Sequence, residues 1–256
     1  MTGAGVPAAT GRVARLCRHP IKSHGREDLS RVDLTEGRGL PWDRHWAVAH
    51  EAARLSPGWN PCANFATATK APALAAMTAR LDEGSAWVSL HHPDRPPFAF
   101  APDDPAHLPA FLAWIGPLHP ANRARPVALA KAGRAMTDTD YPSVSILNLA
   151  SGEALGRAMG ADLSPHRWRA NLWVEGLDPW AERDWIGRRV RIGGAVLEVT
   201  EHIVRCRATE ANPETGRLDA GTLAALRATQ GHQEMGVYAV VVTGGRVAAG
   251  DGVVPL

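Results

Sequence analysis

"VRIGGAVLEVTEHIVRCRATEANPETG", residues 190–216, decides how the second half of this chain is interpreted. Two runs rich in alternating apolar residues flank Gly193–Gly194, a pattern typical of a hairpin between antiparallel strands. The second run leads to Cys206, which stands just ahead of the turn sequence "NPETG". The stretch therefore predicts a hairpin with a cysteine at the end of its second strand.

The sequence around this hairpin predicts more short strands and few helices. "SVSILNLASGEALGRAMG" (143–160) is typical of a strand followed by a helix over 149–159, with Ser151 as the helix cap. "GVYAVVVTGGRVAAGDGVV" (236–254) predicts a final hairpin that turns at Gly244–Gly245. "DAGTLAALRATQG" (219–231) predicts a second helix, capped by Asp219 or Thr222 and ended by Gly231. Several strands with two short helices indicate a second half that resembles a β-barrel.

The first half also favours short strands. "RVARLCRHPIKS" (12–23) is typical of a strand that ends at Pro20, and "RHWAVAH" (44–50) is typical of another. The alternation in "SAWVSL" (85–90) predicts a third. The segment 91–109 is rich in proline and is predicted to hold no long regular element. We place a domain junction between residues 100 and 125. The predicted fold class is therefore α+β, mainly β.

Composition excludes several classes of protein. The 28 basic and 26 acidic residues leave a net charge of +2, which gives no reason to expect nucleic-acid or membrane binding. Three cysteines cannot build a disulfide framework or supply the four thiolates of a typical iron–sulfur cluster, so we expect a cytoplasmic protein. The first eleven residues lack the features of a secretory signal and are expected to form a floppy tail.

The neighbours of Cys206 point to chemistry. Arg205 and Arg207 flank it, and positive charge favours the thiolate form of a cysteine. A thiolate at a strand end suits soft-metal ligation or sulfur transfer. The alternative is that Cys206 is a small buried apolar residue of the core.

Three short motifs place basic side chains near hydroxyl or amide donors. They are "HPIKS" with Lys22, "WDRHW" with Arg44, and "HRWRANLW" with Arg167, Arg169 and Asn171. Such groups bind phosphate, although each motif alone could be a solvated surface. The sequence has no glycine-rich phosphate loop, so ordinary nucleotide binding is not expected.

Taken in order along the chain, these motifs resemble the MOSC proteins, which carry the C-terminal domain of molybdenum cofactor sulfurase behind an N-terminal β-barrel domain. The resemblance covers residues 12–254, and its most specific parts, taken together, are the stretch from Arg205 to Gly216 and the W-R-x-N stretch. It implies an N-terminal MOSC β-barrel domain over residues 12–110. A MOSC β-barrel domain with short helices would follow over residues 120–256.

The resemblance implies a molybdenum cofactor, Mo-molybdopterin, and assigns residues to it. Cys206 matches the cysteine that ligates molybdenum in amidoxime-reducing members, and would be both metal ligand and catalytic residue. The matching cofactor-binding residues are Lys22, Arg44, Arg169, Asn171 and Arg205. The sequence departs from the family pattern at Asn212, where an aspartate is common.

The implied activity is the reduction of small N-hydroxylated compounds such as amidoximes, hydroxylamines and N-hydroxylated bases. Electrons would come from a separate ferredoxin- or cytochrome-like reductase. His202 and Glu210 flank the cysteine and are candidate proton donors. The alternative is a carrier that delivers the cofactor, or a persulfide sulfur on Cys206, to a client enzyme. A third interpretation is a cofactor-free binding module.

Overall fold

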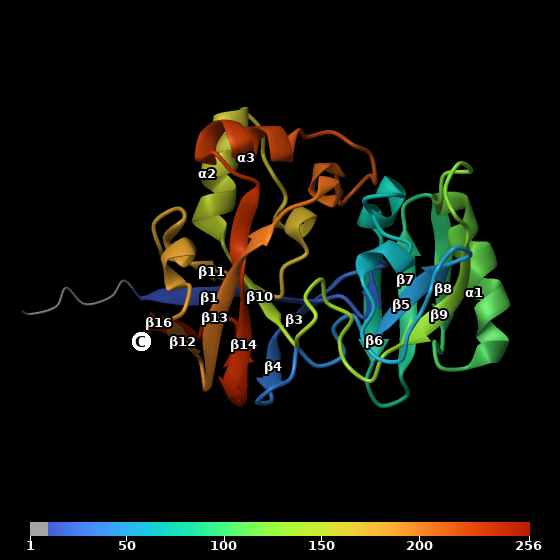
Figure 1. Ribbon diagram of the computed structural model, residues 1–256, viewed down its shortest axis with the longest axis horizontal. Coiled ribbons are helices and arrows are strands. Elements are labelled where there is room, and N and C mark those ends of the chain that lie inside the picture. The colour runs from blue at the N-terminus through green and yellow to red at the C-terminus, as the bar shows by residue number, and fades with distance from the viewer. Residues whose placement is uncertain (1–9) are drawn as a thin grey trace, which may run out of the picture.

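The computed structural model describes residues 10–256, which form two lobes side by side (Figure 1). We call the lobe that contains the C-terminal strands the barrel lobe, and the lobe around β5 to β9 the N-terminal lobe. The tail predicted over residues 1–11 lies outside the described residues except for its last two. Among residues 10–256, no helix has the length and apolar surface needed to cross a bilayer.

Seven strands close into a barrel because β11 pairs with β1 as well as with β10. In order around the barrel they are β11 (Leu172–Glu175), β10 (Val144–Asn148), β14 (Glu234–Thr243), β13 (Ala195–Val204), β12 (Arg189–Ile192), β16 (Gly252–Pro255) and β1 (Gly11–Arg18). Their apolar side chains fill the interior: Leu16, Ile146, Leu172, Leu197 and Val237 are fully buried. The hairpin predicted around Gly193–Gly194 is confirmed as β12–β13.

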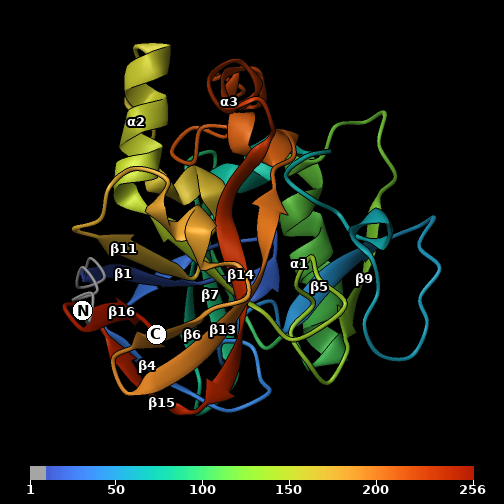
Figure 2. The ribbon, with the colours of Figure 1, turned by 60° about the vertical axis from the view of Figure 1, so that its left-hand side comes forward.

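A helix connects the one parallel pair of this barrel, β10 and β11. It is α2 (Leu149–Met159), which stands beside α3 (Thr222–Gln230) at one end of the barrel (Figure 2). The predicted bounds of α2 are confirmed, but the predicted cap is wrong. Asn148 is the cap, because its side-chain oxygen accepts the Ala150 N–H at 3.1 Å. Ser151 is buried instead and donates to Glu182.

The N-terminal lobe holds two small sheets and one α-helix. Their elements are β2 (Ile21–Lys22), β5 (Trp46–His50), β9 (Pro126–Lys131), β6 (Thr78–Asp82), β7 (Trp87–His92), β8 (Arg95–Phe100) and α1 (Leu108–Ile115). A second core fills this lobe, where the rings of Phe100 and Phe111 stack with centroids 4.5 Å apart. The mainly β, α+β fold class is therefore confirmed, with three short α-helices in the described chain.

Strand β8 lies within the proline-rich segment that was predicted to hold no long regular element. It pairs only with β7, at the edge of its sheet. Pro96 and Pro97 fall at the register shift between the Leu90–Phe98 and His92–Arg95 pairs, so neither has a partner in β7. On the other side, the sheet edge, no strand needs their missing N–H groups.

Strand pairing crosses the predicted domain division in both directions. β1 comes from the predicted N-terminal domain but belongs to the barrel, and β9 comes from beyond residue 120 but pairs with β5. β3 (Glu27–Leu29) pairs with β1, and β4 (Arg31–Leu34) pairs with β15 (Gly245–Ala248). The last pairing corrects the predicted final hairpin, since β15 turns away from β14. The division into 12–110 and 120–256 stays a prediction.

Candidate functional site

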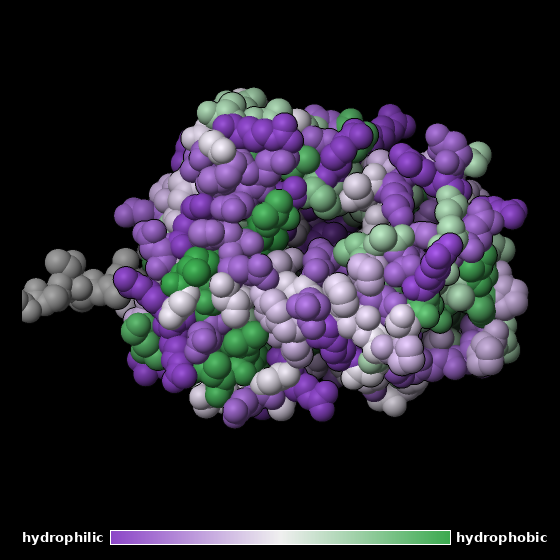
Figure 3. Space-filling model, viewed as in Figure 1, coloured by the Kyte–Doolittle hydropathy of each residue, from purple (hydrophilic) through white to green (hydrophobic). Residues whose placement is uncertain are grey.

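A cavity of about 350 Å³ lies where the two lobes meet, and both contribute to its walls. The space-filling view shows a hollow between the lobes with hydrophilic residues inside (Figure 3). From the N-terminal lobe come β2, the one-turn helix η1 (Cys62–Asn64) and the segment 67–70. From the barrel lobe come η5 (Pro165–Trp168), the end of β13 and η7 (Arg207–Glu210).

Cys206 lies in this cavity, between the end of β13 and η7. Its side chain is exposed, which excludes the interpretation of Cys206 as a buried core residue. The sulfur lies 3.3 Å from the hydroxyl oxygen of Thr69, which belongs to the N-terminal lobe. We call the part of the cavity around this exposed sulfur its mouth. A sulfur in this position can reach both a bound group and a molecule that arrives from solvent.

Arg205 anchors the strand end that carries Cys206. Its guanidinium donates to the backbone oxygens of Met235 and Trp168, with the shortest bond at 2.6 Å, and lies over the Trp168 ring. Burial lowers the pKa of Arg205 to about 10. The arginine is thus charged at neutral pH and held in place beside the cysteine.

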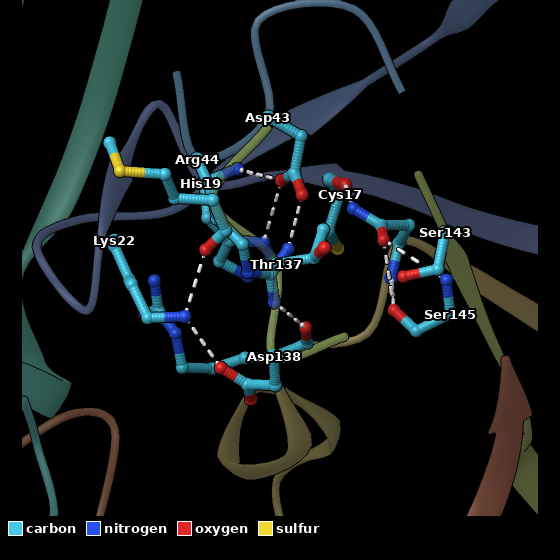
Figure 4. A network of polar contacts seen from close by, with 12 residues as sticks. Cys17, His19, Lys22, Asp43, Arg44, Thr137, Asp138, Ser143 and Ser145 are labelled. Carbon is cyan, nitrogen blue, oxygen red and sulfur yellow. Dashed lines mark hydrogen bonds and ion pairs between the residues drawn. The ribbon is translucent and has the colours of Figure 1, made fainter. Parts of the chain in front are cut away.

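Lys22 is buried, and we call the part of the cavity around it the floor. Figure 4 shows its side chain beside that of Asp138, which comes from a distant segment. Its ammonium donates to the Met136 backbone oxygen at 2.8 Å and to Asp138 Oδ1 at 2.6 Å. The Cys62 thiol donates to the same carboxylate oxygen at 2.9 Å. Desolvation by the surrounding cavity opposes the charge of Asp138, whose side chain is 57% exposed, but Lys22 and then Arg44 lower its pKa well below the usual range, so it is a carboxylate.

Arg44 and Arg169 come together although 125 positions separate them. Arg44 donates to the Arg169 backbone oxygen at 2.9 Å and pairs with the buried carboxylate of Asp43. Burial, and next the charge of Arg44, lower the pKa of Arg169 to about 9. This charge is therefore destabilised in the cavity as it stands, and an anion close to it would relieve the repulsion.

The backbone is strained at three positions along the cavity wall. Ser23, Arg44 and Arg169 have φ of 62°, 49° and 50°, in the left-handed region that residues other than glycine rarely adopt. Such strain clusters at binding sites, where the surrounding structure holds residues in place for a ligand.

Asn171 lies behind the wall and is not among the residues that line the cavity. Its side-chain oxygen accepts from the N–H and the hydroxyl of Ser145, and its amide donates to the Cys17 backbone oxygen. Ser145 does line the cavity. The structure therefore places Asn171 as a support for Ser145, and its predicted contact with a cofactor stays a prediction.

The charge of the cavity is strongly positive. Its lining includes the basic residues Lys22, Lys70, Arg44, Arg167, Arg169 and Arg205. Asp138 is the one carboxylate that the described residues contribute to the lining. Lys70, Arg169 and Arg205 have no carboxylate partner among residues 10–256. A chain with a net charge of only +2 thus concentrates positive charge in one place, as a polyanionic ligand requires.

Two residues that line the cavity, Arg167 and Trp168, have hydrogen-bond donors that are not used within residues 10–256. Arg167 Nε and Nη1 and Trp168 Nε1 are buried and have no hydrogen-bond partner among the described residues. Arg167 uses its remaining nitrogen, Nη2, to pair with Asp219 at 2.7 Å. Buried donors without acceptors are costly, and both residues line the cavity. The residues present therefore fit an anionic group rich in hydrogen-bond acceptors, such as a phosphorylated pterin.

The predicted proton donors His202 and Glu210 do not line the cavity. His202 lies 3.5 Å from Glu234, and Glu210 pairs with Arg207 at 3.0 Å. The side-chain oxygen of Asn212 accepts hydrogen bonds from the backbone N–H groups of Glu214 and Thr215, in its own turn.

Sequence reasoning did not identify several residues that line the cavity: Cys62, Thr69, Lys70, Asp138 and Tyr238. No local motif marks them, because each becomes part of the site only when the two lobes meet.

Comparison with known proteins agrees with the two-part architecture. The MOSC domain model matches residues 134–254, and the model of the MOSC N-terminal beta barrel domain matches residues 10–110. The chain is 26% identical over 236 residues to a molybdenum cofactor sulfurase of Caenorhabditis elegans. That match covers 88% of this chain and 33% of the relative, so the chain spans about a third of the relative's length.

The solved structures that are similar to this chain include YuaD and YiiM. YuaD from Bacillus subtilis has 16% identity and a TM-score of 0.49, with 95% of this chain and 94% of that chain covered. YiiM from Geobacillus stearothermophilus has 18% identity and a TM-score of 0.35, with 44% and 53% covered. On the two domain matches, which together cover most of its length, the chain belongs to the MOSC-domain family, with an N-terminal MOSC β-barrel domain ahead of the MOSC domain.

Proposed function

We propose that this protein binds Mo-molybdopterin between its lobes and reduces small N-hydroxylated compounds. One observation carries the proposal: an exposed cysteine, Cys206, opens onto a cavity whose buried wall carries unused donors and unpaired positive charge. A thiolate is the ligand that soft transition metals prefer, and the arginines suit a phosphate.

The two ends of the cavity suit the two ends of the cofactor. Lys22, Arg44 and Arg169, together with the free nitrogens of Arg167, would hold the phosphate and pterin. Cys206 at the mouth would be the protein ligand to molybdenum. When bound, the cofactor supplies two-electron redox chemistry at the metal. The protein fixes the cofactor's orientation and leaves the metal end open to substrate.

Reduction of an amidoxime consumes two electrons and two protons: R–C(NH2)=NOH + 2 e⁻ + 2 H⁺ gives R–C(NH2)=NH and water. The N–O bond breaks, and its oxygen leaves in the water. A separate reductase would supply the electrons. The Cys62 thiol lines the cavity and donates to the Asp138 carboxylate at 2.9 Å, which fixes both side chains at the site. Because His202 and Glu210 do not line the cavity, we do not assign them to proton delivery.

The test uses protein produced in a host that makes the cofactor, with a chemically reduced viologen as electron source. The viologen removes the need to know the natural donor. Formation of benzamidine from benzamidoxime, in proportion to the molybdenum content, is the expected result. Protein loaded with molybdenum and pterin that leaves amidoximes, hydroxylamines and N-hydroxylated bases unchanged would overturn the proposal.

A carrier is the second candidate, and the exposure of the Cys206 sulfur favours it too. The neighbouring Val204 is 71% exposed, so the mouth is open to a client protein as well as to a small molecule. A persulfide on Cys206 would release thiocyanate on treatment with cyanide. Its detection in a protein without reductase activity would favour the carrier.

A further inference from the structure

Lys70 is the cation at the mouth of the cavity. It follows Thr69, whose hydroxyl contacts Cys206, and both residues line the cavity. The ammonium lies 3.2 Å from the Ala63 backbone oxygen and 3.4 Å from His50 Nε2. His50 Nε2 itself lies 2.7 Å from that same oxygen, so it acts as a donor there and cannot accept from Lys70. The three donors of Lys70 thus share a single acceptor in the part of the chain that the structure describes.

Two other lysines of the chain, Lys22 and Lys131, each have a carboxylate partner. Lys22 pairs with Asp138 at 2.6 Å, and Lys131, on the far strand of the same lobe, pairs with Asp103 at 2.7 Å. Lys70 has no carboxylate partner among residues 10–256. Its free donors are therefore available to a ligand.

The cofactor phosphate is not the ligand that Lys70 suits best. The cavity already holds buried basic residues for a phosphate, namely Lys22 and Arg167. Lys70 lies instead beside the contact with Cys206, on the side where a substrate must arrive. Its surroundings at the mouth include the apolar side chains of Val204 and Ala63. A cation beside apolar surface suits a small molecule with an apolar body and one anionic group.

We propose that Lys70 is a specificity-determining residue, and that the preferred substrates are N-hydroxylated compounds that carry a carboxylate or a phosphate. This inference rests on the proposed reductase function. The ammonium binds the anionic group through charge-assisted hydrogen bonds while the N–O bond lies toward Cys206. Neutral amidoximes are then substrates too, but weaker ones.

The experiment compares matched substrates on the cofactor-loaded protein. Benzamidoxime and 4-carboxybenzamidoxime test the carboxylate, and an N-hydroxylated adenosine and its 5′-monophosphate test the phosphate. We expect a KM lower by about tenfold for the anionic member of one or both pairs. Lys70→Met should remove that advantage, leave the KM of the neutral member within about twofold, and leave the pterin content unchanged. Lys131→Met is the matched control and should change neither ratio.

A binding measurement separates this inference from the proposed function. The affinities of benzamidine and 4-carboxybenzamidine, the corresponding products, are measured by calorimetry for the wild type and Lys70→Met. Equal KM and equal affinity within each pair in the wild type would overturn the role of Lys70, even if the protein reduces amidoximes. Loss of pterin from Lys70→Met would also overturn it, because Lys70 would then hold the cofactor. A protein that reduces no member of either pair would contradict the proposed function itself.

Discussion

The hydroxyl oxygen of Thr69 lies 3.3 Å from the sulfur of Cys206, which joins residues 137 positions apart across the boundary between the lobes. The predicted metal ligand therefore has one neighbour that the MOSC domain alone does not provide. The N-terminal lobe also contributes Lys22, Cys62 and Lys70 to the cavity. The site consequently depends on how the lobes pack together.

Packing between the lobes can be tested at Gly216. Its φ is +69°, and a Cβ added there would lie 2.7 Å from the Ala73 Cα in the N-terminal lobe. Gly216→Ala should therefore lower the free energy of unfolding by about 1–3 kcal/mol. Gly116→Ala is the control, because no atom lies within 4 Å of the added Cβ and its φ is helical. Urea denaturation of both variants gives the comparison, and equal stability of the two would contradict the tight contact.

Arg169→Ala should weaken cofactor retention. The guanidinium lies at the cavity with a lowered pKa, and its one hydrogen bond within residues 10–256 is to the Gly25 backbone oxygen at 3.2 Å. Loss of a charge-assisted bond to a phosphate costs about 1.5–3 kcal/mol, or a tenfold to hundredfold loss of affinity. Pterin content after extended dialysis is the measurement. Arg12→Ala, at an exposed ion pair with Glu175, should retain as much pterin as the wild type, and equal retention by Arg169→Ala would speak against the assignment.

The three cysteines should react with iodoacetamide in a fixed order at pH 8. Cys206 is exposed and should be labelled first. Burial, and next the charge of Asp138, raise the pKa of Cys62 to about 11, so only a small fraction of this side chain is thiolate at pH 8. Burial also raises the pKa of Cys17, which should react last. Peptide mapping follows the labels. Asp138→Asn should speed labelling of Cys62, and an unchanged rate would show that the carboxylate does not control this thiol.

Stability should fall as the pH drops below about 6.5. His24 is fully buried, and burial lowers its pKa from 6.5 to about 3. A lowered pKa means that the unfolded chain takes up a proton between pH 6.5 and 3 while the folded chain does not. The stabilisation that neutral His24 contributes is thus complete above pH 6.5. Between pH 6.5 and 3 the free energy of unfolding decreases by about 1.4 kcal/mol for each pH unit.

His24→Gln should reduce that slope, since a glutamine does not titrate. Urea midpoints of both proteins from pH 7 to 4 provide the measurement. A wild-type midpoint that stays constant over this range would contradict the buried neutral histidine.

Local sequence signals predicted the elements that are determined locally. The glycines of 193–194 define the β12–β13 hairpin, and the apolar spacing that ends at Gly160 defines α2. The cap was missed because Asn148 and Ser151 are both good capping residues, and only the buried carboxylate of Glu182 shows why the serine is used elsewhere. β15 was misassigned because a pair of glycines does not reveal which strand the chain will pair with next.

The site itself was only partly predictable. Cys206 and the basic residues stand in recognisable motifs, and the structure brings Lys22, Arg44, Arg169 and Arg205 to one cavity with it. Asp138 gave no such signal, because its role depends on Lys22 and Cys62, which arrive from distant segments.

The central claim is that Cys206 ligates a molybdenum cofactor, and one measurement tests it most directly. Molybdenum and pterin are quantified in the wild type and in Cys206→Ser, both produced in a host that makes the cofactor. We predict equal molar amounts of molybdenum, pterin and chain in the wild type, and loss of molybdenum from a variant that remains folded, because the Cys206 side chain is exposed and adds little to the core. A folded Cys206→Ser protein with the full metal content would contradict the ligand assignment. A wild type with neither metal nor pterin would contradict the cofactor site.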